Sequence, residues 1–142
     1  MENLTAEAWT VIEASAAEVW RALVTPEIIK RYMFGATVVA DWRVGGSIVW
    51  RGDWKGKPYE DKGEIVRFDP ERQLRYTHWS PLSGTPDTPE NRHTVTVDLE
   101  AEGARTRVSL SQDGNRTAEE RAHSETNWKK MLEELKRTVE SS

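Results

Sequence analysis

Cysteine is absent from the sequence, which excludes disulfide bonds, thiol nucleophiles and thiolate-bound zinc. Also absent is any apolar run near the roughly 20 residues that a membrane helix needs. The chain has no basic surplus either, since its formal net charge is -4, and proteins that bind nucleic acids usually carry a basic face. The sequence therefore predicts neither a membrane span nor a nucleic-acid partner.

The N-terminal residues, MENLTAEAW, lack the basic and apolar regions of a signal peptide. Together with the lack of cysteine, this favours a reducing cytoplasm as the location. The 142 residues are about the length of one ordinary domain, and no linker or repeat divides them. We therefore expect one domain over residues 1–142. Seven tryptophans are many for this length, and they are the feature of the composition that needs explaining.

The first part of the chain predicts one strand followed by two short helices. Residues 7–14 alternate between apolar and polar side chains as a half-buried strand does. Ser15 is followed three residues later by Glu18, which is the pattern of a capping box at the start of a helix. The dipeptide Thr25-Pro26 predicts a second helix, with threonine as the N-cap and proline at the first helical position.

After residue 35 the apolar period changes from about 3.6 to 2, which predicts a series of strands. We expect them over residues 36–43, 47–54, 60–69, 73–80, 93–99 and 105–112. The adjacent Gly45 and Gly46 lie between two of these strands, where they can supply the positive φ angles of a tight turn. A phosphate-binding loop would instead place glycines between a strand and a helix. We interpret the pair as a hairpin turn and expect no nucleotide site.

The last part of the chain predicts a long helix. Thr117 and Glu120 form a second capping box, and the helical pattern runs to about residue 139. Its apolar residues form one stripe: Trp128, Met131, Leu132, Leu135 and Val139. A strand, two short helices, five or six antiparallel strands and a long helix predict an α+β fold in which a curved sheet wraps around the final helix.

Five segments of the sequence occur in an order that resembles a known family. They are VWRALVTPEIIKRYM (19–33), DWRVGGSI (41–48), GEIVRFDPERQL (63–74), TRVSLSQDG (106–114) and NWKKMLEEL (127–135). Together they resemble the Aha-type family, the homologues of the C-terminal domain of the activator of the heat-shock chaperone ATPase. This family belongs to the START-like, helix-grip superfamily (SRPBCC). The resemblance covers nearly the whole chain.

The resemblance implies a helix-grip (START-like) fold. In this fold a seven-stranded antiparallel sheet grips the C-terminal helix, and two short helices after the first strand close one end. The resemblance also implies a cavity between the sheet and the helix. Because the family is named after a chaperone activator, it further implies a role in the stress response and a chaperone or other protein partner as an alternative to a small ligand.

Inward-facing positions on three strands, together with the stripe on the final helix, predict the side chains that would line such a cavity. These are Tyr32, Trp50, Tyr76, His78, Gln112 and Trp128. Aromatic walls suit apolar ligands, and a few polar groups would orient the ligand. A cavity for a drug-sized ligand would have a volume of about 300 to 1,000 Å³. The alternative for each tryptophan is ordinary core packing, since aromatic rings bury large areas without any ligand.

Two histidines are the only candidates for a metal site. His78 and His93 are expected nearly opposite each other on neighbouring strands, where Cβ atoms come within about 5 Å. A catalytic zinc site usually has three protein ligands, and His123 is the only other histidine. We therefore expect two hydrogen-bonded histidines near a loop, no metal site and no cofactor.

The leading hypothesis from the sequence is the binding of a small hydrophobic or aromatic molecule in the cavity. One alternative is a protein-interaction module, chaperone-linked or otherwise, that acts through its surface. Another is a cyclase-like or hydrolase-like enzyme that uses the same cavity, with a tyrosine or histidine as general acid or base. No motif of nucleophile plus base appears, and Glu60, Asp61 and Glu64 resemble an exposed strand edge, so binding is favoured over catalysis. The ligand, any catalytic residue and the oligomeric state are left open.

Overall fold

The computed structural model describes residues 3–81 and 84–141. Its first elements are strand β1 (Leu4–Ile12) and the short helices α1 (Ala16–Val24) and α2 (Pro26–Tyr32). Helix α1 begins where the Ser15 hydroxyl accepts a hydrogen bond from the backbone N–H of Glu18, at 3.2 Å. Helix α2 begins with proline at its first position, as predicted, although the Thr25 side chain makes no capping hydrogen bond.

Six further strands complete one sheet. They are β2 (Thr37–Ala40), β3 (Ser47–Trp54), β4 (Lys57–Asp69), β5 (Gln73–His78), β6 (His93–Glu102) and β7 (Arg105–Asn115). The strand order is β1-β7-β6-β5-β4-β3-β2, and every neighbouring pair is antiparallel. A 3-10 turn, η2 (Pro89–Asn91), lies between β5 and β6. The seven-stranded sheet confirms the helix-grip fold.

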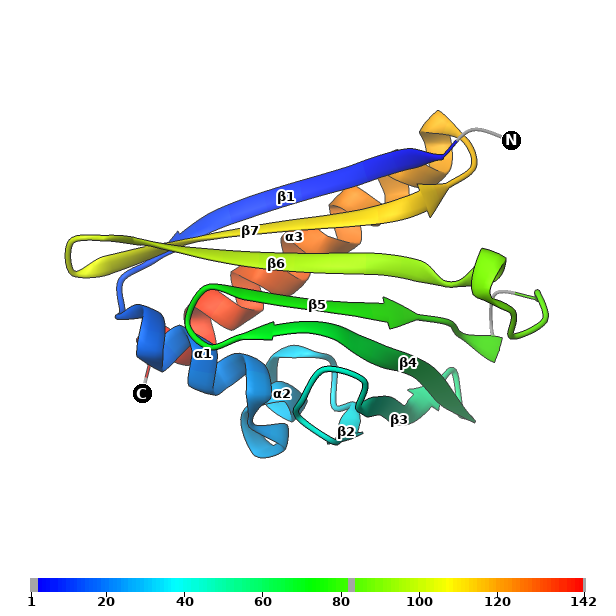
Figure 1. The fold of residues 1–142 in the computed structure, drawn as a ribbon, viewed down its shortest axis with the longest axis horizontal. Coiled ribbons are helices and arrows are strands. Elements are labelled where there is room, and N and C mark those ends of the chain that lie inside the picture. The colour runs from blue at the N-terminus through cyan, green and yellow to red at the C-terminus, as the bar shows by residue number, and fades with distance from the viewer. Residues whose placement is uncertain (1–2, 82–83, 142) are drawn as a thin grey trace.

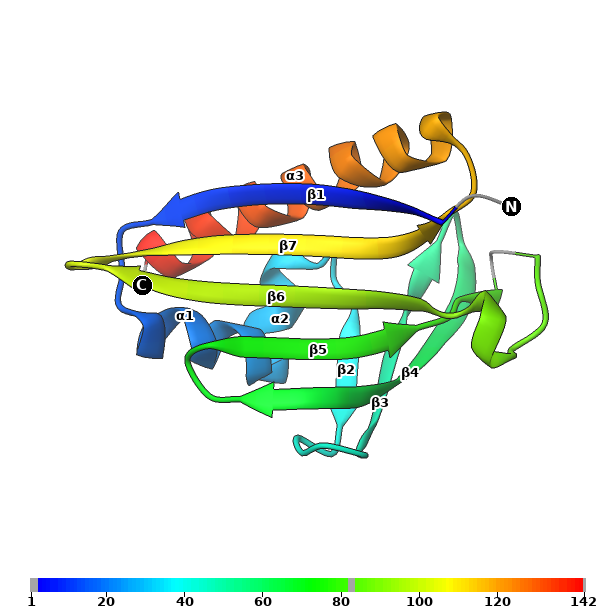
Figure 2. The same cartoon turned by 45° about the horizontal axis from the view of Figure 1, so that its top comes forward.

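The long helix α3 (Ala118–Glu140) crosses one face of the sheet, and α1 and α2 lie at the end where the chain terminates (Figures 1 and 2). The Thr117 hydroxyl accepts a hydrogen bond from the backbone N–H of Glu120 at 3.0 Å, which confirms the second capping box. The predicted stripe points into the core: Met131, Leu132, Leu135 and Val139 are buried, and Trp128 is half-buried. This packing leaves the core between the sheet and the three helices.

The glycine pair between β2 and β3 forms a turn, but its two members have different roles. Gly45 has a φ of +85°, the left-handed conformation that was predicted. Gly46 does not have a positive φ; a Cβ atom there would lie 1.9 Å from the carbonyl oxygen of Asp41. The turn also continues the pairing with β4, because Gly45 N–H donates to Ile65 O and Ile65 N–H donates to Gly46 O. The pair is therefore part of the sheet scaffold.

The two edges of the sheet differ. At the β1 edge, side chains of α3 satisfy backbone groups: Lys136 Nζ donates to the carbonyl oxygen of Val11 at 2.7 Å, and the backbone N–H of Glu13 donates to a carboxylate oxygen of Glu140 at 2.8 Å. Covering an edge in this way protects it from pairing with another chain. The other edge is the four-residue strand β2. Within the described part of the chain, no helix is both long and apolar enough to span a bilayer.

Candidate functional site

An apolar pocket, here called the inner pocket, lies between the sheet and the three helices. Its lining combines aliphatic, aromatic and methionine side chains: Leu23, Ile29, Tyr32, Met33, Val38, Trp42, Ile48, Trp50, Leu74, Tyr76, Val97 and Met131. Its volume is about 30 Å³. That is space for about one or two water molecules, well below the volume predicted for a drug-sized ligand. The predicted volume is wrong, because aromatic rings fill the space between the layers.

Two tyrosines bring hydroxyl groups to this apolar surrounding. The Tyr32 hydroxyl donates a hydrogen bond to the carbonyl oxygen of Ala22 at 2.9 Å. Burial, and to a lesser extent the nearby Tyr76, raises the pKa of Tyr32, and burial also raises the pKa of Tyr76. Both phenols therefore stay protonated at neutral pH, so they can donate hydrogen bonds but cannot act as bases. The Tyr76 hydroxyl donates to no residue that the structure describes.

A carboxylate and an imidazole form a pair beside the inner pocket. The Nε2 atom of His78 lies 2.8 Å from the Oδ2 atom of Asp61. Asp61 pairs across the strands with Trp50, whose ring centroid lies 5.0 Å from that of His78 and 5.2 Å from that of Tyr76. The Oδ1 atom of Asp61 is buried and has no hydrogen-bond partner among the described residues. Trp50 thus joins the pair to the wall of the inner pocket.

The position of Asp61 corrects the interpretation of this segment as an exposed strand edge. The side chain of Asp61 is only 14% exposed, whereas Glu60 and Glu64 do lie at the surface side of β4. The signal was present in the sequence. Counting back from the buried Ile65 in steps of two leads through Gly63 to Asp61, which places the carboxylate on the inner face.

The structure brings together part of the predicted ligand-binding set. Three of the six residues line the inner pocket: Tyr32, Trp50 and Tyr76. His78 contacts the ring of Trp50 but is not part of the lining. The other two form a separate pair outside the lining, in which the indole N–H of Trp128 donates a hydrogen bond to the side-chain oxygen of Gln112. That these residues contact a ligand stays a prediction.

The two histidines lie opposite each other, as predicted, because His78 and His93 are direct partners in the β5–β6 register. Their rings have different partners, however. The Nδ1 atom of His93 lies 2.9 Å from the carbonyl oxygen of Asp113, while His78 is bonded to Asp61. Within the part of the chain that the structure describes, no three metal-ligating side chains gather in one place.

The Asp61–His78 pair can orient a ligand or move a proton. If neutral His78 donates its Nε2–H to Asp61, its Nδ1 atom is left as an acceptor for a bound hydroxyl or amide group. The same geometry is used where a carboxylate holds a catalytic imidazole.

Comparison with protein families shows a match over most of the chain. The model described as "Activator of Hsp90 ATPase homolog 1-like protein" matches residues 13–140. A comparison with curated proteins found no match.

Solved structures provide close relatives in fold. A protein of Cytophaga hutchinsonii, solved in solution, is 55% identical with a TM-score of 0.86; the alignment covers 99% of this chain and 97% of that one. A Mesorhizobium loti protein is 21% identical, with a TM-score of 0.80 and 98% of both chains covered. The Aha1 dimer from Colwellia psychrerythraea is 20% identical, with a TM-score of 0.75 and 96% of both chains covered. The last two likenesses concern the fold alone.

Proposed function

Because the chain belongs to the family of Activator of Hsp90 ATPase homolog 1-like proteins, we propose that it binds a small apolar or aromatic molecule in the inner pocket. The chemistry of the lining carries this proposal. Trp42, Trp50, Met33 and Met131 contribute an apolar wall, and the hydroxyl of Tyr76 is a polar group without a partner in the described chain. Ligand pockets commonly combine an apolar wall with a few polar groups that fix the orientation of the ligand.

Binding requires the inner pocket to expand from about 30 Å³. Met33 and Met131 are suited to this change, since unbranched methionine side chains repack at low cost. Met33 directly follows α2, which has only seven residues and is held mainly by its contacts with β2 and α3. We therefore place the entrance between α2 and the β2–β3 turn, where the half-buried Met33 and Trp42 lie.

Two groups favour a ligand with a hydroxyl group. Such a hydroxyl can accept a hydrogen bond from Tyr76. If the ring of Trp50 shifts as the pocket expands, the hydroxyl can also donate one to the unpaired Oδ1 atom of Asp61, the cross-strand partner of Trp50, which is not part of the lining. Satisfying a buried acceptor recovers a free energy of about 1 to 3 kcal/mol. A flat aromatic alcohol combines this hydroxyl with a surface that fits against tryptophan and tyrosine rings.

The test uses 2-naphthol as the probe. The control compound is 2-methoxynaphthalene, which has the same rings but no hydroxyl group to donate a hydrogen bond. Both are titrated into the protein while the melting temperature and the amide NMR signals of Leu74, Val97 and Met131 are followed. We expect 2-naphthol to raise the melting temperature and to shift these signals, and 2-methoxynaphthalene to bind more weakly. Unshifted signals at saturating probe would contradict the proposal.

Tyr76→Phe and Tyr59→Phe form a matched pair of variants for the same titration. The first removes a hydroxyl from the inner pocket, and the second removes one from β4, outside the lining. We expect Tyr76→Phe to lower the affinity for 2-naphthol about fivefold to tenfold, as the loss of one hydrogen bond implies. Tyr59→Phe should leave the affinity unchanged, and an equal loss in both variants would contradict the proposed position of the ligand.

A second candidate function is the binding of a chaperone ATPase, which the family description suggests. The observation that favours it is Phe34, whose side chain is 77% exposed although its backbone has a left-handed φ of 54°. A large apolar side chain held at the surface in an unfavourable backbone conformation is unusual and fits a contact with another protein. Phe34 lies three residues before the start of β2, the edge of the sheet that α3 does not cover.

This second candidate is tested with a purified heat-shock chaperone ATPase of the Hsp90 type. We expect the wild-type chain to raise its rate of ATP hydrolysis and Phe34→Asn to reduce the effect, since asparagine tolerates the left-handed conformation. The control is Val66→Thr, which changes an exposed apolar side chain on β4. An unchanged hydrolysis rate with the wild-type chain would reject this function.

A further inference from the structure

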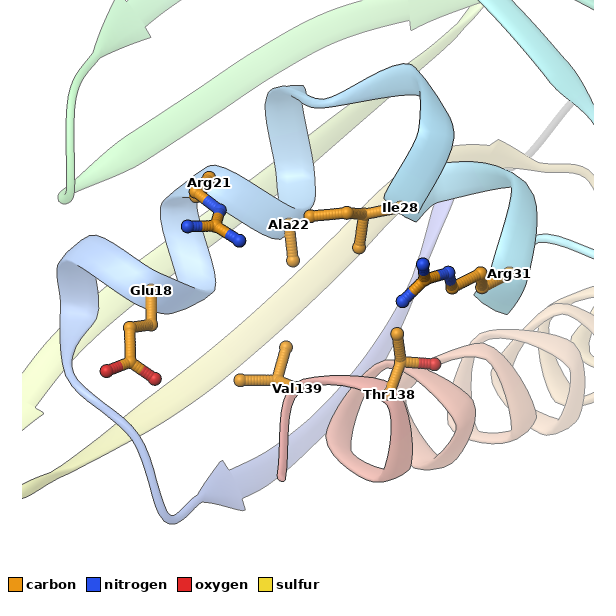
Figure 3. Close-up of a pocket in the computed structure, with 7 residues that line it drawn as sticks. All are labelled: Glu18, Arg21, Ala22, Ile28, Arg31, Thr138 and Val139. Atoms are coloured by element: carbon orange, nitrogen blue, oxygen red, sulfur yellow. The ribbon is translucent and has the colours of Figure 1, made fainter. Parts of the chain in front are cut away.

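A second pocket opens between α1, α2 and the last turns of α3 (Figure 3). We call it the arginine pocket, and its volume is about 380 Å³. The residues that matter for its chemistry are Glu18, Arg21, Ala22, Ile28, Arg31 and Val139. None of its lining residues also lines the inner pocket, so it is a separate site. Its volume lies within the range of about 300 to 1,000 Å³ that is typical of small-molecule sites.

The two arginines of this pocket come from different helices, and their side chains have no partner in the part of the chain that the structure describes. Arg21 lies on α1 and Arg31 on α2, and neither side chain forms an ion pair or hydrogen bond with any residue in the ranges 3–81 and 84–141. Other arginines of the chain do have carboxylate partners: those of Arg43, Arg51 and Arg92 lie at 2.6, 2.8 and 2.9 Å. Arg21 and Arg31 therefore keep their hydrogen-bonding capacity for another molecule.

Between the two guanidinium groups the pocket has an apolar floor. Figure 3 shows Ala22 and Ile28 between the side chains of Arg21 and Arg31, with Val139 facing them from α3. Ala22 and Val139 are buried parts of the core, and Ile28 packs against that core. A ligand in this pocket can therefore contact two guanidinium groups and an apolar surface at once, which a solvated arginine at a flat surface does not allow.

We propose that the arginine pocket binds a small molecule in which a carboxylate or phosphate group is attached to an apolar group. Guanidinium groups match these oxyanions because two N–H groups can meet two oxygen atoms at once. The apolar part of the same molecule would cover Ala22, Ile28 and Val139. Neither the inner pocket nor its ligand is required for this binding.

Other charges near the arginine pocket determine whether a substitution strengthens or weakens the binding of an anion. Glu18 lines the same pocket and repels an anion. The last turn of α3, which contains Val139, carries a partial negative charge that also opposes an anion. The two arginines outweigh these contributions, since they add two full positive charges. Removing the charge of Glu18 should therefore tighten the binding, whereas removing the charge of either arginine should weaken it.

The probe for this site is hexanoate, with hexan-1-ol and acetate as controls that lack the charge and the apolar chain, respectively. We expect hexanoate to shift the amide NMR signals of Ala22, Ile28 and Val139 and to leave those of the inner pocket, such as Val97, unchanged. Both controls should bind at least about tenfold more weakly than hexanoate. Equal affinity for hexanoate and hexan-1-ol, or no shift with hexanoate, would overturn the proposal.

Four variants test the role of each charge. Arg21→Gln and Arg31→Gln should each weaken hexanoate binding about tenfold, as the loss of a charge-assisted hydrogen bond implies. Glu18→Gln should strengthen it, and glutamine keeps the residue type of the capping box at the start of α1. Lys30→Gln is the matched control, because it removes the same charge from α2 outside the pocket. If Lys30→Gln weakens binding as much as Arg31→Gln, the attraction comes from net charge alone and the proposed site is wrong.

Discussion

Asp61 shares only one of its two carboxylate oxygens with His78. The Oδ2 atom lies 2.8 Å from His78 Nε2, while the Oδ1 atom is buried without a partner in the described chain. A buried acceptor without a donor costs about 1 to 3 kcal/mol of stability. The unpaired Oδ1 atom lies on the inner face of the sheet, beside Trp50. A ligand or a water molecule that donates a hydrogen bond to it would remove this loss of stability.

His78→Phe should lower the free energy of unfolding by about 1 to 3 kcal/mol, because it leaves both oxygens of the Asp61 carboxylate without a donor. The phenyl ring keeps the edge contact with Trp50, so that loss of the hydrogen bond dominates the effect. The measurement is urea unfolding followed by tryptophan fluorescence at neutral pH.

The double variant His78→Phe/Asp61→Leu is the control for this prediction. It removes both polar partners, and replacing both partners by apolar groups is often nearly neutral. We expect it to recover most of the stability that His78→Phe loses. A double variant less stable than His78→Phe would mean that Asp61 has a stabilising partner other than His78.

We expect alanine substitutions at the two glycines of the turn between β2 and β3 to lower the stability of the protein by different amounts. Gly45→Ala places a Cβ atom in open space but at a φ of +85°, which costs about 1 to 2 kcal/mol. Gly46→Ala places a Cβ atom 1.9 Å from the carbonyl oxygen of Asp41, so the backbone must move and the loss should be larger. Melting temperatures of the two variants compare these costs, and a smaller loss for Gly46→Ala would contradict the model of the turn.

These glycines show what the sequence can and cannot predict. Their place between two strands predicted the turn and excluded a phosphate loop. The sequence did not predict that Gly46 is required by close approach to Asp41, because this contact depends on how the turn folds back. The fold was predictable from capping boxes, periodicity and motif order, since these are local signals.

The candidate site was less predictable, since it depends on packing between distant segments. Trp50 and Tyr76 were placed on the inner face by alternation alone. Alternation could not reveal that their rings lie 5.2 Å apart and help to reduce the inner pocket to about 30 Å³. Asp61 was misjudged because three acidic residues within five positions resemble a solvated edge, although the register with Trp50 turns one of them inward.

Leu132→Ala should destabilise the protein by about 2 to 5 kcal/mol, since this side chain is almost fully buried where α3 meets the sheet. Lys130→Ala, two residues earlier on the exposed side of the helix, should cost less than about 0.5 kcal/mol. Urea unfolding of both variants measures the difference. Equal losses would mean that α3 does not dock on the sheet with this face.

Glu140 should make a small contribution to stability that depends on pH. The backbone N–H of Glu13, and after it Lys136, lowers the pKa of Glu140 from its usual 4.5. A carboxyl group whose pKa is lower in the folded state stabilises the fold above its unfolded-state pKa, and this contribution is lost as the pH falls through the folded-state value. Because Glu140 lies at the surface, the contribution should stay below about 1 kcal/mol.

Glu140→Gln tests this contribution, because it keeps an acceptor for Glu13 N–H but removes the charge. The variant should be slightly less stable than the wild type at neutral pH, and the difference should disappear in acid below the folded-state pKa of Glu140. Unfolding free energies at several pH values give the comparison. A difference that grows on acidification would contradict the assigned sign.

Met131→Ala should both destabilise the protein and create room for a ligand. Met131 is buried and lines the inner pocket, so its truncation should cost about 2 to 5 kcal/mol and enlarge the space against Trp50 and Tyr76. Binding of an aromatic probe such as 2-naphthol at about 100 times its dissociation constant would add roughly 2.7 kcal/mol to the stability of this variant.

Leu132→Ala is the matched control, because it truncates a buried neighbour on the same helix that does not line the inner pocket. We expect 2-naphthol to restore the melting temperature of Met131→Ala and to leave that of Leu132→Ala nearly unchanged. Equal recovery in both variants would show that the probe binds elsewhere, and no recovery in Met131→Ala would show that the inner pocket does not accept an aromatic ligand even when enlarged.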